Sequence, residues 1–123
     1  SFVKEENINK EAFNNNVRKR LYKMKDKFHL FQPLVTKEIK RKNPIDAFAF
    51  YYGFTIRPLI ELLGINCRLF KFEFGFRYIH KDFPEDIQKT ITQLIYIKDL
   101  DELSNKHQEA INLFNEYYNK LSL

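Results

Sequence analysis

One stretch of this sequence, from Phe48 to Phe83, gathers aromatic rings and charges in the same segment. It holds eleven of the chain's twenty aromatic residues, together with charged residues such as Arg57, Glu61 and Arg77. Rings at this density must lie in a core, yet a charge that is buried without a partner is strongly destabilising. We therefore expect these charges to pair with one another or to contact a bound molecule.

Size and composition favour one domain, residues 1–123, with a single core. No apolar run approaches the length of about 20 residues that a membrane-spanning helix needs, so we expect no membrane partner. Cys67 is the only cysteine, which excludes an intrachain disulfide and a cysteine-based zinc site and is compatible with a reducing, cytoplasmic setting. Because the sequence begins at Ser1 without methionine, we interpret the chain as a fragment or an accessory domain of a larger protein.

The positive charge is concentrated in one part of the chain. Between Arg18 and Lys42 there are ten basic and two acidic residues, a net charge of +8, whereas the rest of the chain carries −3. A field of this sign attracts phosphate groups, nucleic acid or an acidic protein surface, although a solvated helix face explains the same pattern. The candidate anion-binding or nucleic-acid-binding residues of this segment are Arg18, Arg20, Lys23, Lys40 and Arg41.

The sequence predicts an all-α fold, a single-domain bundle of about five helices, because glycine is sparse and apolar residues recur every three or four positions. The first helix is expected to begin near Asn9 and to carry an apolar stripe that serves the core or a docking partner. The expected helices cover residues 9–27, 30–42, 44–63, 84–95 and 99–121, and the stripe of the first comprises Phe13, Val17, Leu21 and Met24.

Proline and glycine set the expected ends and irregularities of the third helix. Pro44 fits its first turn, and Pro58 lies inside it, where proline removes a backbone donor and clashes with the preceding turn. A kink near Phe54 and Thr55, or a split into two helices, is therefore expected. Gly64 is expected to follow the last residue of this helix.

Residues 65–82 interrupt the helical pattern. Aromatic and other side chains alternate here, as they would in a strand. No second alternating run exists to pair with it, and an isolated strand leaves its backbone groups without partners. We therefore expect an aromatic-rich irregular segment, with room for one helical turn, that packs on the helices.

The sequence predicts no catalytic and no metal-binding residues. Asp99 and Asp101 have the spacing with which nucleotidyltransferases hold magnesium, but they stand at an expected helix start, where acids cap backbone donors. The three histidines, His29, His80 and His107, are dispersed, and the serines lie near the termini or on a polar helix face. We expect the chain alone to be non-catalytic.

Two pairs of residues in the aromatic stretch are candidates for ligand contact. Arg57 and Glu61 are four residues apart on one expected helix face, and Arg77 and Tyr78 follow Gly75, where backbone can approach a ligand closely. A guanidinium presents a bidentate fork to phosphate or carboxylate. Both a structural ion-pair network and a substrate- or ligand-binding site fit this pattern.

The same residues carry a family resemblance. The run TIRPLIELLGINCRLFKFEFGFRYIHKDFPEDI, followed by DLDELSNKHQEAINLF, resembles the C-terminal helical region of an uncharacterised group of archaeal and bacterial nucleotidyltransferase-like proteins of the polymerase-β superfamily. A pattern R-P-L-[IV]-E-L-L falls on residues 57–63, an aromatic-rich D-F-G-x-R-Y falls on residues 73–78 with Glu73 in place of Asp, and D-[LF]-P falls on residues 82–84. The likeness is good over the second half of the chain and loose over the first.

In that group, a polymerase-β-like catalytic domain precedes the helical region. The Gly-Ser turn and paired aspartates of such a domain do not occur in this sequence. The resemblance therefore implies a non-catalytic accessory domain that helps to bind substrate or nucleotide, with a polymerase-β-like catalytic domain as its partner in cis or in trans. Nucleotide and Mg²⁺ would belong to that catalytic domain, and no cofactor is expected in this chain.

Other classes of function remain open. A basic nucleic-acid-binding module is suggested by the +8 segment and by nearby rings such as Tyr22, Phe28 and Phe31. A structural protein-interaction domain would dock through the exposed part of the first apolar stripe. A small toxin-like ribonuclease is disfavoured, because Arg77 and His80 are closer in sequence than the Arg and His of those enzymes.

Overall fold

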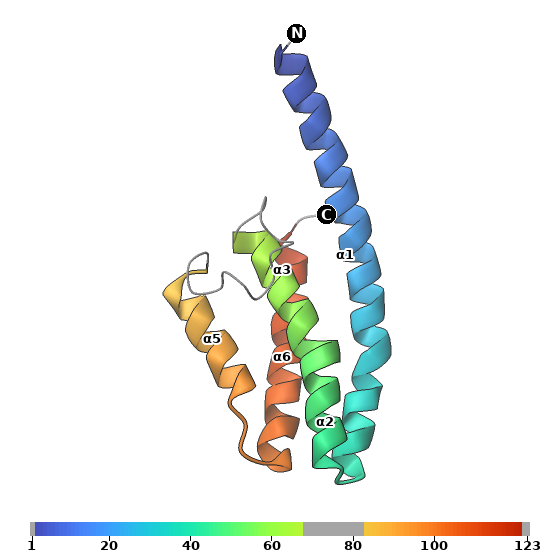
Figure 1. Cartoon of the computed structure of the whole chain (residues 1–123), viewed down its shortest axis with the longest axis vertical. Coiled ribbons are helices and arrows are strands. Elements are labelled where there is room, and N and C mark those ends of the chain that lie inside the picture. The colour runs from blue at the N-terminus through green and yellow to red at the C-terminus, as the bar shows by residue number, and fades with distance from the viewer. Residues whose placement is uncertain (1, 68–82, 122–123) are drawn as a thin grey trace.

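The computed structural model describes residues 2–67 and 83–121, and within α1 and α3 it leaves the side chains of residues 2–14, 17, 66 and 67 undescribed. The described residues form four helices and no strand when α2, η1 and α3 are counted as one continuous helix (Figure 1). The all-α prediction is confirmed. The elements are α1 (Phe2–Lys40), α2 (Pro44–Phe50), the π-helix η1 (Tyr51–Ile56), α3 (Arg57–Cys67), α5 (Glu85–Ile95) and α6 (Leu100–Lys120).

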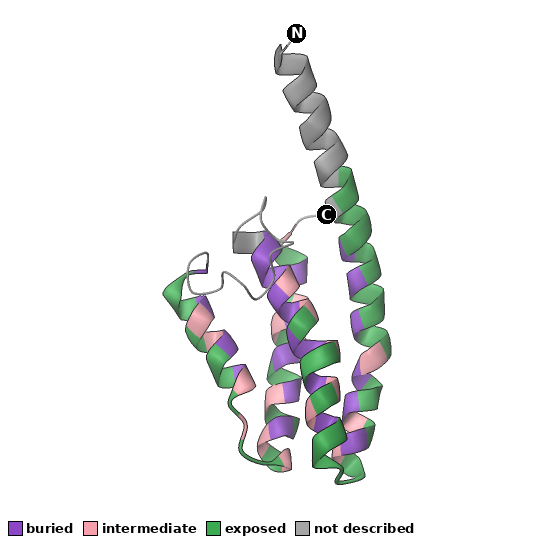
Figure 2. Cartoon of the chain, viewed as in Figure 1, coloured by how far each residue is buried: buried purple, intermediate pink, exposed green. Residues whose placement is uncertain are grey.

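Helix α1 joins the two helices that the sequence pattern separated at residues 28–29. It continues through this region to Lys40, so the expected count of about five helices is not confirmed. The break was wrong because the buried side chains keep a spacing of three or four residues across it, with Phe28 fully buried at its centre. Pro33, expected in the first turn of a separate helix, lies inside α1 with an exposed side chain. Figure 2 shows the buried residues on the side of α1 that faces the other helices.

The kink predicted near Phe54 and Thr55 takes the form of the π-helix η1. The N–H of Arg57 bonds to the carbonyl of Tyr52, five residues before it, in place of the usual four. Pro58 follows directly and has no N–H to donate to the carbonyl of Phe54. The wider π-turn is thus the local response to the proline.

Helix α3 continues past the glycine that was expected to follow it. Gly64 is buried inside α3, which ends at Cys67, so the predicted end at Leu63 is wrong. An internal glycine costs a helix about 1 kcal/mol relative to alanine. Burial of the flanking Leu63 and Ile65 outweighs this cost, because each fully buried aliphatic side chain contributes about 1.5–3 kcal/mol.

The buried amide of Gln32 connects α1, η1 and α6. Its Nε2 donates hydrogen bonds of 2.8 Å to the carbonyls of Phe28 and Phe54, and the latter is the carbonyl that Pro58 cannot serve. Its Oε1 accepts from the Thr55 hydroxyl at 2.6 Å and lies 2.8 Å from Nε2 of His107. Because an amide oxygen only accepts, the neutral His107 ring carries its proton on Nε2. Both N–H donors and both oxygen lone pairs of the Gln32 amide therefore have hydrogen-bond partners.

Two adjacent tyrosines attach η1 to the C-terminal end of α5. The hydroxyl of the fully buried Tyr51 donates to the carbonyl of Leu94 at 2.7 Å, and the hydroxyl of Tyr52 donates to that of Ile95 at 3.0 Å. The last carbonyls of a helix have no partner within it, so these phenols complete the end of α5. Burial raises the pKa of the Tyr51 hydroxyl, so the phenol remains a donor.

The predicted helix starts after the aromatic segment agree with the structure. Asp99 is the N-cap of α6, and its carboxylate accepts from the N–H of Glu102 at 2.8 Å. Pro84 is the N-cap of α5, with Glu85 and Asp86 in the first turn. Asp99 therefore has the capping role expected of it in preference to magnesium binding.

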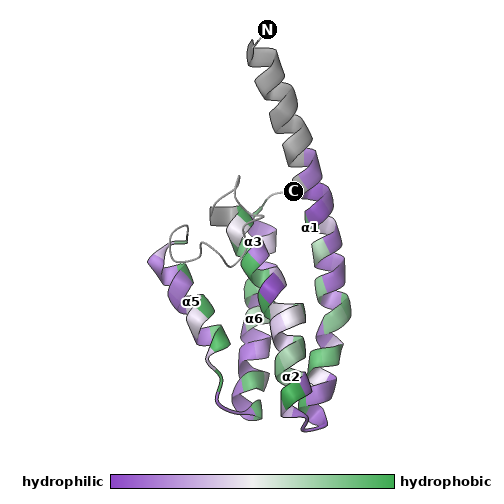
Figure 3. Ribbon diagram, viewed as in Figure 1, coloured by the Kyte–Doolittle hydropathy of each residue, from purple (hydrophilic) through white to green (hydrophobic). Residues whose placement is uncertain are grey.

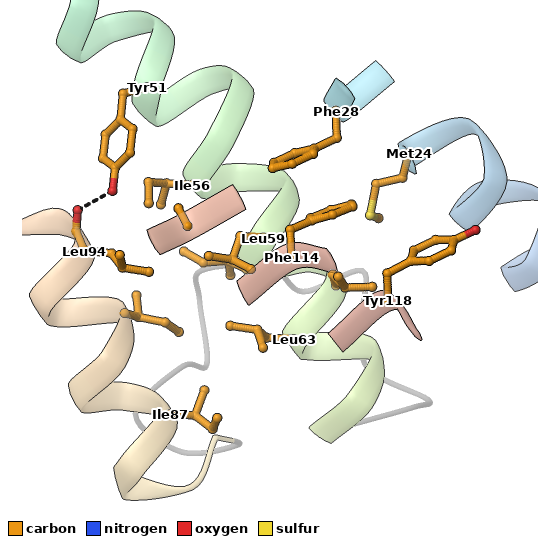
Figure 4. Packing of buried hydrophobic residues seen from close by; sticks show 14 of the residues in the cluster. Met24, Phe28, Tyr51, Ile56, Leu59, Leu63, Ile87, Leu94, Phe114 and Tyr118 are labelled. Carbon is orange, nitrogen blue, oxygen red and sulfur yellow. Dashed lines mark hydrogen bonds between the residues drawn. The ribbon is translucent and has the colours of Figure 1, made fainter. Parts of the chain in front are cut away.

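The core lies where α1, the α2–η1–α3 helix, α5 and α6 meet (Figure 4). Phe28 of α1 and Phe114 of α6 stack at its centre with ring centroids 3.8 Å apart. Aliphatic residues of α3 and α5 belong to the same cluster, including Leu59, Leu63 and Ile87.

The turn between α1 and α2 closes with Lys42 in the left-handed region, at φ 60°. The N–H of Asn43 bonds to the carbonyl of Glu38, and the N–H of Lys42 bonds to that of Ile39, which is the Schellman arrangement. Pro44 begins α2, as predicted.

The aromatic-rich segment predicted for residues 65–82 lies mostly outside the described residues. Residues 65–67, its first three, belong to α3 and are helical, so the irregular segment is not confirmed for them. Residues 68–82 are not described, and the expectation for them stays a prediction.

Replacement of Gln32 by leucine should lower the free energy of unfolding by about 2–4 kcal/mol, because it leaves the Phe54 carbonyl and the His107 N–H without this partner. Pro58→Ala supplies an N–H near the Phe54 carbonyl, so in the Gln32→Leu background it should recover about 1–2 kcal/mol. Urea unfolding of the four chains of this cycle gives the coupling. Gln93→Leu, at an exposed site on α5, serves as the control and should change stability little. Additive effects of the two substitutions would contradict the role given to Gln32.

Stability should fall on acidification because His107 is buried and neutral. Burial lowers the pKa of His107 from 6.5 to about 4, so above pH 6.5 the folded and unfolded chains carry the same charge at this residue. As the pH falls below 6.5, only the unfolded chain binds the proton, and the free energy of unfolding decreases by about 1.4 kcal/mol per pH unit, or about 3 kcal/mol in all.

Urea unfolding between pH 7 and pH 4 measures this slope. His107→Gln, which cannot titrate, should flatten it, whereas replacement of the exposed His29 by glutamine should leave it unchanged. Equal slopes in the wild type and in His107→Gln would show that another group causes the acid sensitivity.

Candidate functional site

A cleft of about 280 Å³ opens between α1 and the η1–α3 segment. Its position follows from the fold, because α1 and the α2–η1–α3 helix pack side by side and the π-turn and Pro58 lie opposite the middle of α1. Cations from α1 line one side, rings and other apolar groups form the floor, and a carboxylate stands on the α3 side. The lining residues are Arg20, Lys23, Met24, Lys27, Phe28, Phe31, Gly53, Phe54, Pro58 and Glu61.

An ion pair joins the two walls of this cleft. The guanidinium of Arg20 on α1 contacts the carboxylate of Glu61 on α3 through both Nε and Nη2. The Arg20 side chain is 52% exposed and that of Glu61 28%, so water screens the pair and its contribution to stability is at most about 1 kcal/mol. An anion that enters the cleft can compete with Glu61 for Arg20 at little cost.

The floor of the cleft contains flat aromatic surface. Phe31 of α1 and Phe54 of η1 stack with centroids 4.7 Å apart, and Phe50 lies against Phe54 at 5.4 Å. Phe31, Phe50 and Phe54 are each only partly buried. Partly exposed rings beside cations can stack on a planar group while the cations hold its charge.

Gly53 leaves part of the wall open. It is exposed, and a Cβ atom added there would have no heavy atom within 4 Å. A side chain at this position would therefore extend into free space beside the cleft without disturbing the helix packing. This makes position 53 a means of closing the cleft by substitution.

A second cleft of about 810 Å³ lies along the C-terminal half of α1, next to Ile111 of α6. Lys37, Lys40 and Arg41 contribute positive charge to it, and Arg41 also pairs with Glu38 at 3.7 Å. Cations at the C-terminal end of a helix interact favourably with its dipole, which explains their position without a ligand.

The structure brings some of the predicted site residues together and separates others. Arg20 and Lys23 lie in the first cleft with Glu61, whereas Lys40 and Arg41 lie in the second. Lys23 and Lys40 are seventeen residues apart on one helix, a distance of about 25 Å at 1.5 Å per residue. The predicted basic face is therefore two clusters. Arg18 is exposed outside both clefts.

The pairing proposed for the aromatic stretch is changed in one respect. The sequence suggested Arg57 as the partner of Glu61, and the structure gives Glu61 a partner from another helix, Arg20. Arg57 is exposed at the start of α3, one turn before Glu61. Arg77 and Tyr78 lie outside the described residues, so their predicted role is unchanged.

Sequence reasoning missed the residues that shape the cleft from the η1 side. Gly53 and the Phe54 ring enter it because η1 is a π-helix, which shifts the register of the following side chains. The signal available in the sequence was Pro58, which predicted a kink but not its form. Gln32, Thr55 and His107 were also missed as a buried polar cluster, because they are far apart in sequence.

Metal binding finds no support in the described part of the chain. No group of three or more His, Cys, Asp or Glu side chains is positioned there to hold a metal ion. Within the same residues, none of the helices combines the length and the apolar content required to cross a bilayer.

Comparison of the sequence with models of known protein families and with curated proteins, and of the structure with solved structures, finds no match.

Proposed function

We propose that this chain is the non-catalytic helical accessory domain of a nucleotidyltransferase-like protein and that it binds a nucleotide in the cleft between α1 and η1–α3. The observation that carries the proposal is the composition of the cleft, where the stacked rings of Phe31 and Phe54 adjoin the cations Arg20, Lys23 and Lys27. A nucleotide offers a planar base for the rings and phosphates for the cations. The sequence resemblance supplies the class of protein.

Each part of the cleft has a role in this proposal. The base would stack on the exposed faces of Phe31 and Phe54, and Lys23 and Lys27 would hold a phosphate. Arg20 would exchange Glu61 for the phosphate, so that binding loosens the ion pair between α1 and α3.

The remaining predicted residues complete the proposal. Arg57, Arg77 and Tyr78 would add contacts from the following segment, and a polymerase-β-like catalytic domain, in cis or in trans, would hold Mg²⁺ and perform any transfer. The setting proposed is the cytoplasm.

The proposal predicts that closing the cleft abolishes nucleotide binding. Gly53→Phe places a ring beside the cleft, and it should weaken binding of a fluorescent ATP analogue at least about tenfold, a loss of about 1.4 kcal/mol. Gly53→Ala adds a single methyl group into open space and is the matched control, with affinity close to that of the wild type. Fluorescence anisotropy measures the affinities, and thermal melting checks that both variants fold.

A double variant tests the charges separately. Lys23→Gln with Lys27→Gln should weaken the same binding, whereas Lys19→Gln, on the exposed surface outside the cleft, should not. Equal affinity in the wild type, in Gly53→Phe and in the double lysine variant would exclude this cleft as the site.

A second candidate function, nucleic-acid binding, is favoured by the exposure of the cations. All ten basic residues between Arg18 and Lys42 are exposed, and they form clusters at both ends of a stretch of α1 about 25 Å long. If a single-stranded RNA tracked this stretch, its affinity should fall at least about tenfold between 50 and 200 mM salt, because several counterions are released. A filter-binding titration at the two salt concentrations measures this. No binding at the lower concentration would remove this candidate.

A further inference from the structure

A ridge of six residues runs along the outer side of α1 between the two clefts. Its members are spaced four, three, four, three and four residues apart, which keeps them on one narrow side of the helix. This spacing has a mean of 3.6 residues, the period of an α-helix, so the six side chains form a continuous line that α1 can present to a partner. The ridge comprises Lys23, Lys27, Leu30, Leu34, Lys37 and Arg41.

The centre of the ridge is apolar and open to solvent. Leu30 is 69% exposed and Leu34 37% exposed, whereas other leucines of the chain, such as Leu59, are buried in the core. Neither residue lines the nucleotide cleft or the second cleft. Figure 3 shows green, hydrophobic residues between purple, hydrophilic ones along the described part of the α1 ribbon. The pair lies one turn apart, so a single partner can cover both.

The two ends of the ridge are positively charged and almost unneutralised. Within residues 2–67 and 83–121, Lys23, Lys27 and Lys37 have no ion-pair partner, and only Arg41 contacts a carboxylate, that of Glu38. An apolar centre between charged ends has the arrangement of a protein interface, with a dry core and a polar rim. A nucleic-acid backbone would contact the cations alone, so it would not account for the exposed leucines between them.

We propose that the ridge docks an acidic amphipathic helix of a partner protein. The partner helix would lay apolar side chains over Leu30 and Leu34 and place Asp or Glu opposite Lys23, Lys27, Lys37 and Arg41. The straight line of side chains along one side of α1 suits a partner helix that lies along it, and the charge at both ends selects acidic flanks. This proposal does not rest on nucleotide binding, because the two leucines that define it lie outside that cleft, but it shares Lys23 and Lys27 with the cleft.

A designed peptide is a direct probe of this surface. It is a helix of about 20 residues, the length that spans Lys23 to Arg41, with two central leucines four residues apart and glutamates facing the four cations. Fluorescence anisotropy should show that the whole chain binds this labelled peptide and does not bind a copy in which lysine replaces each glutamate. The Leu30→Gln, Leu34→Gln double variant should weaken binding at least about tenfold.

Tyr22→Gln is the matched control, since Tyr22 is an exposed apolar residue of α1 outside the ridge, 53% exposed. It should leave peptide binding unchanged, and the leucine variant should keep both its melting temperature and its affinity for the nucleotide analogue. The proposal is overturned if the chain does not bind the acidic peptide, or if the leucine variant binds it as the wild type does. It is also overturned in favour of nucleic acid if RNA binds more tightly than the peptide and the leucine variant retains that binding.

Discussion

The amide of Gln32 is the interaction on which the arrangement of the helices depends. Pro58 leaves the Phe54 carbonyl without its usual donor at a partly buried place beside α1, and a carbonyl that is shielded from water without a partner is costly. Gln32 supplies that donor from α1, and its oxygen accepts from Thr55 and from His107 of α6. One side chain thus constrains how α1, η1 and α6 are positioned relative to one another. Hydrogen bonds require specific partners at specific distances, whereas apolar packing alone would tolerate small shifts of one helix along another.

The same network determines the form of the cleft proposed to bind a nucleotide. Phe31 precedes Gln32 on α1, and Phe54 is held through its carbonyl by the Gln32 amide, so the stacked rings of the floor are bound to a rigid core. The rim differs, because the Arg20–Glu61 pair is partly exposed and only weakly stabilising. A rigid aromatic floor suits the selection of a planar group. A rim whose ion pair can give way to another anion suits the binding of a charged group beside it. Such a site loses little conformational entropy on binding.

Sequence patterns correctly predicted those elements whose form depends on residues within one or two helical turns. Apolar periodicity gave the α2–η1–α3 helix, Pro58 gave its irregularity, and Asp99 gave the cap of α6, because each effect acts within one or two turns. Pro33 misled the prediction of α1, since the packing of Phe28 overrides a single unfavourable residue. The cleft was less accessible to prediction. The positive charge of its α1 side could be counted from the sequence, but the Arg20–Glu61 pair joins residues 41 positions apart and depends on how the helices pack.

The two binding proposals are linked through shared charge. Lys23 and Lys27 line the proposed nucleotide-binding cleft and also form one end of the ridge, so acidic groups of a docked helix and phosphates of a nucleotide would compete for the same ammonium groups. Such competition is a coupling free energy, and each ligand must weaken the other by the same factor. Leu30 and Leu34 would contact the partner helix, whereas Phe31 and Phe54 would contact the base, so neither ligand would need to displace the other completely. A partner helix would therefore adjust nucleotide affinity through electrostatics while the aromatic floor stays in place.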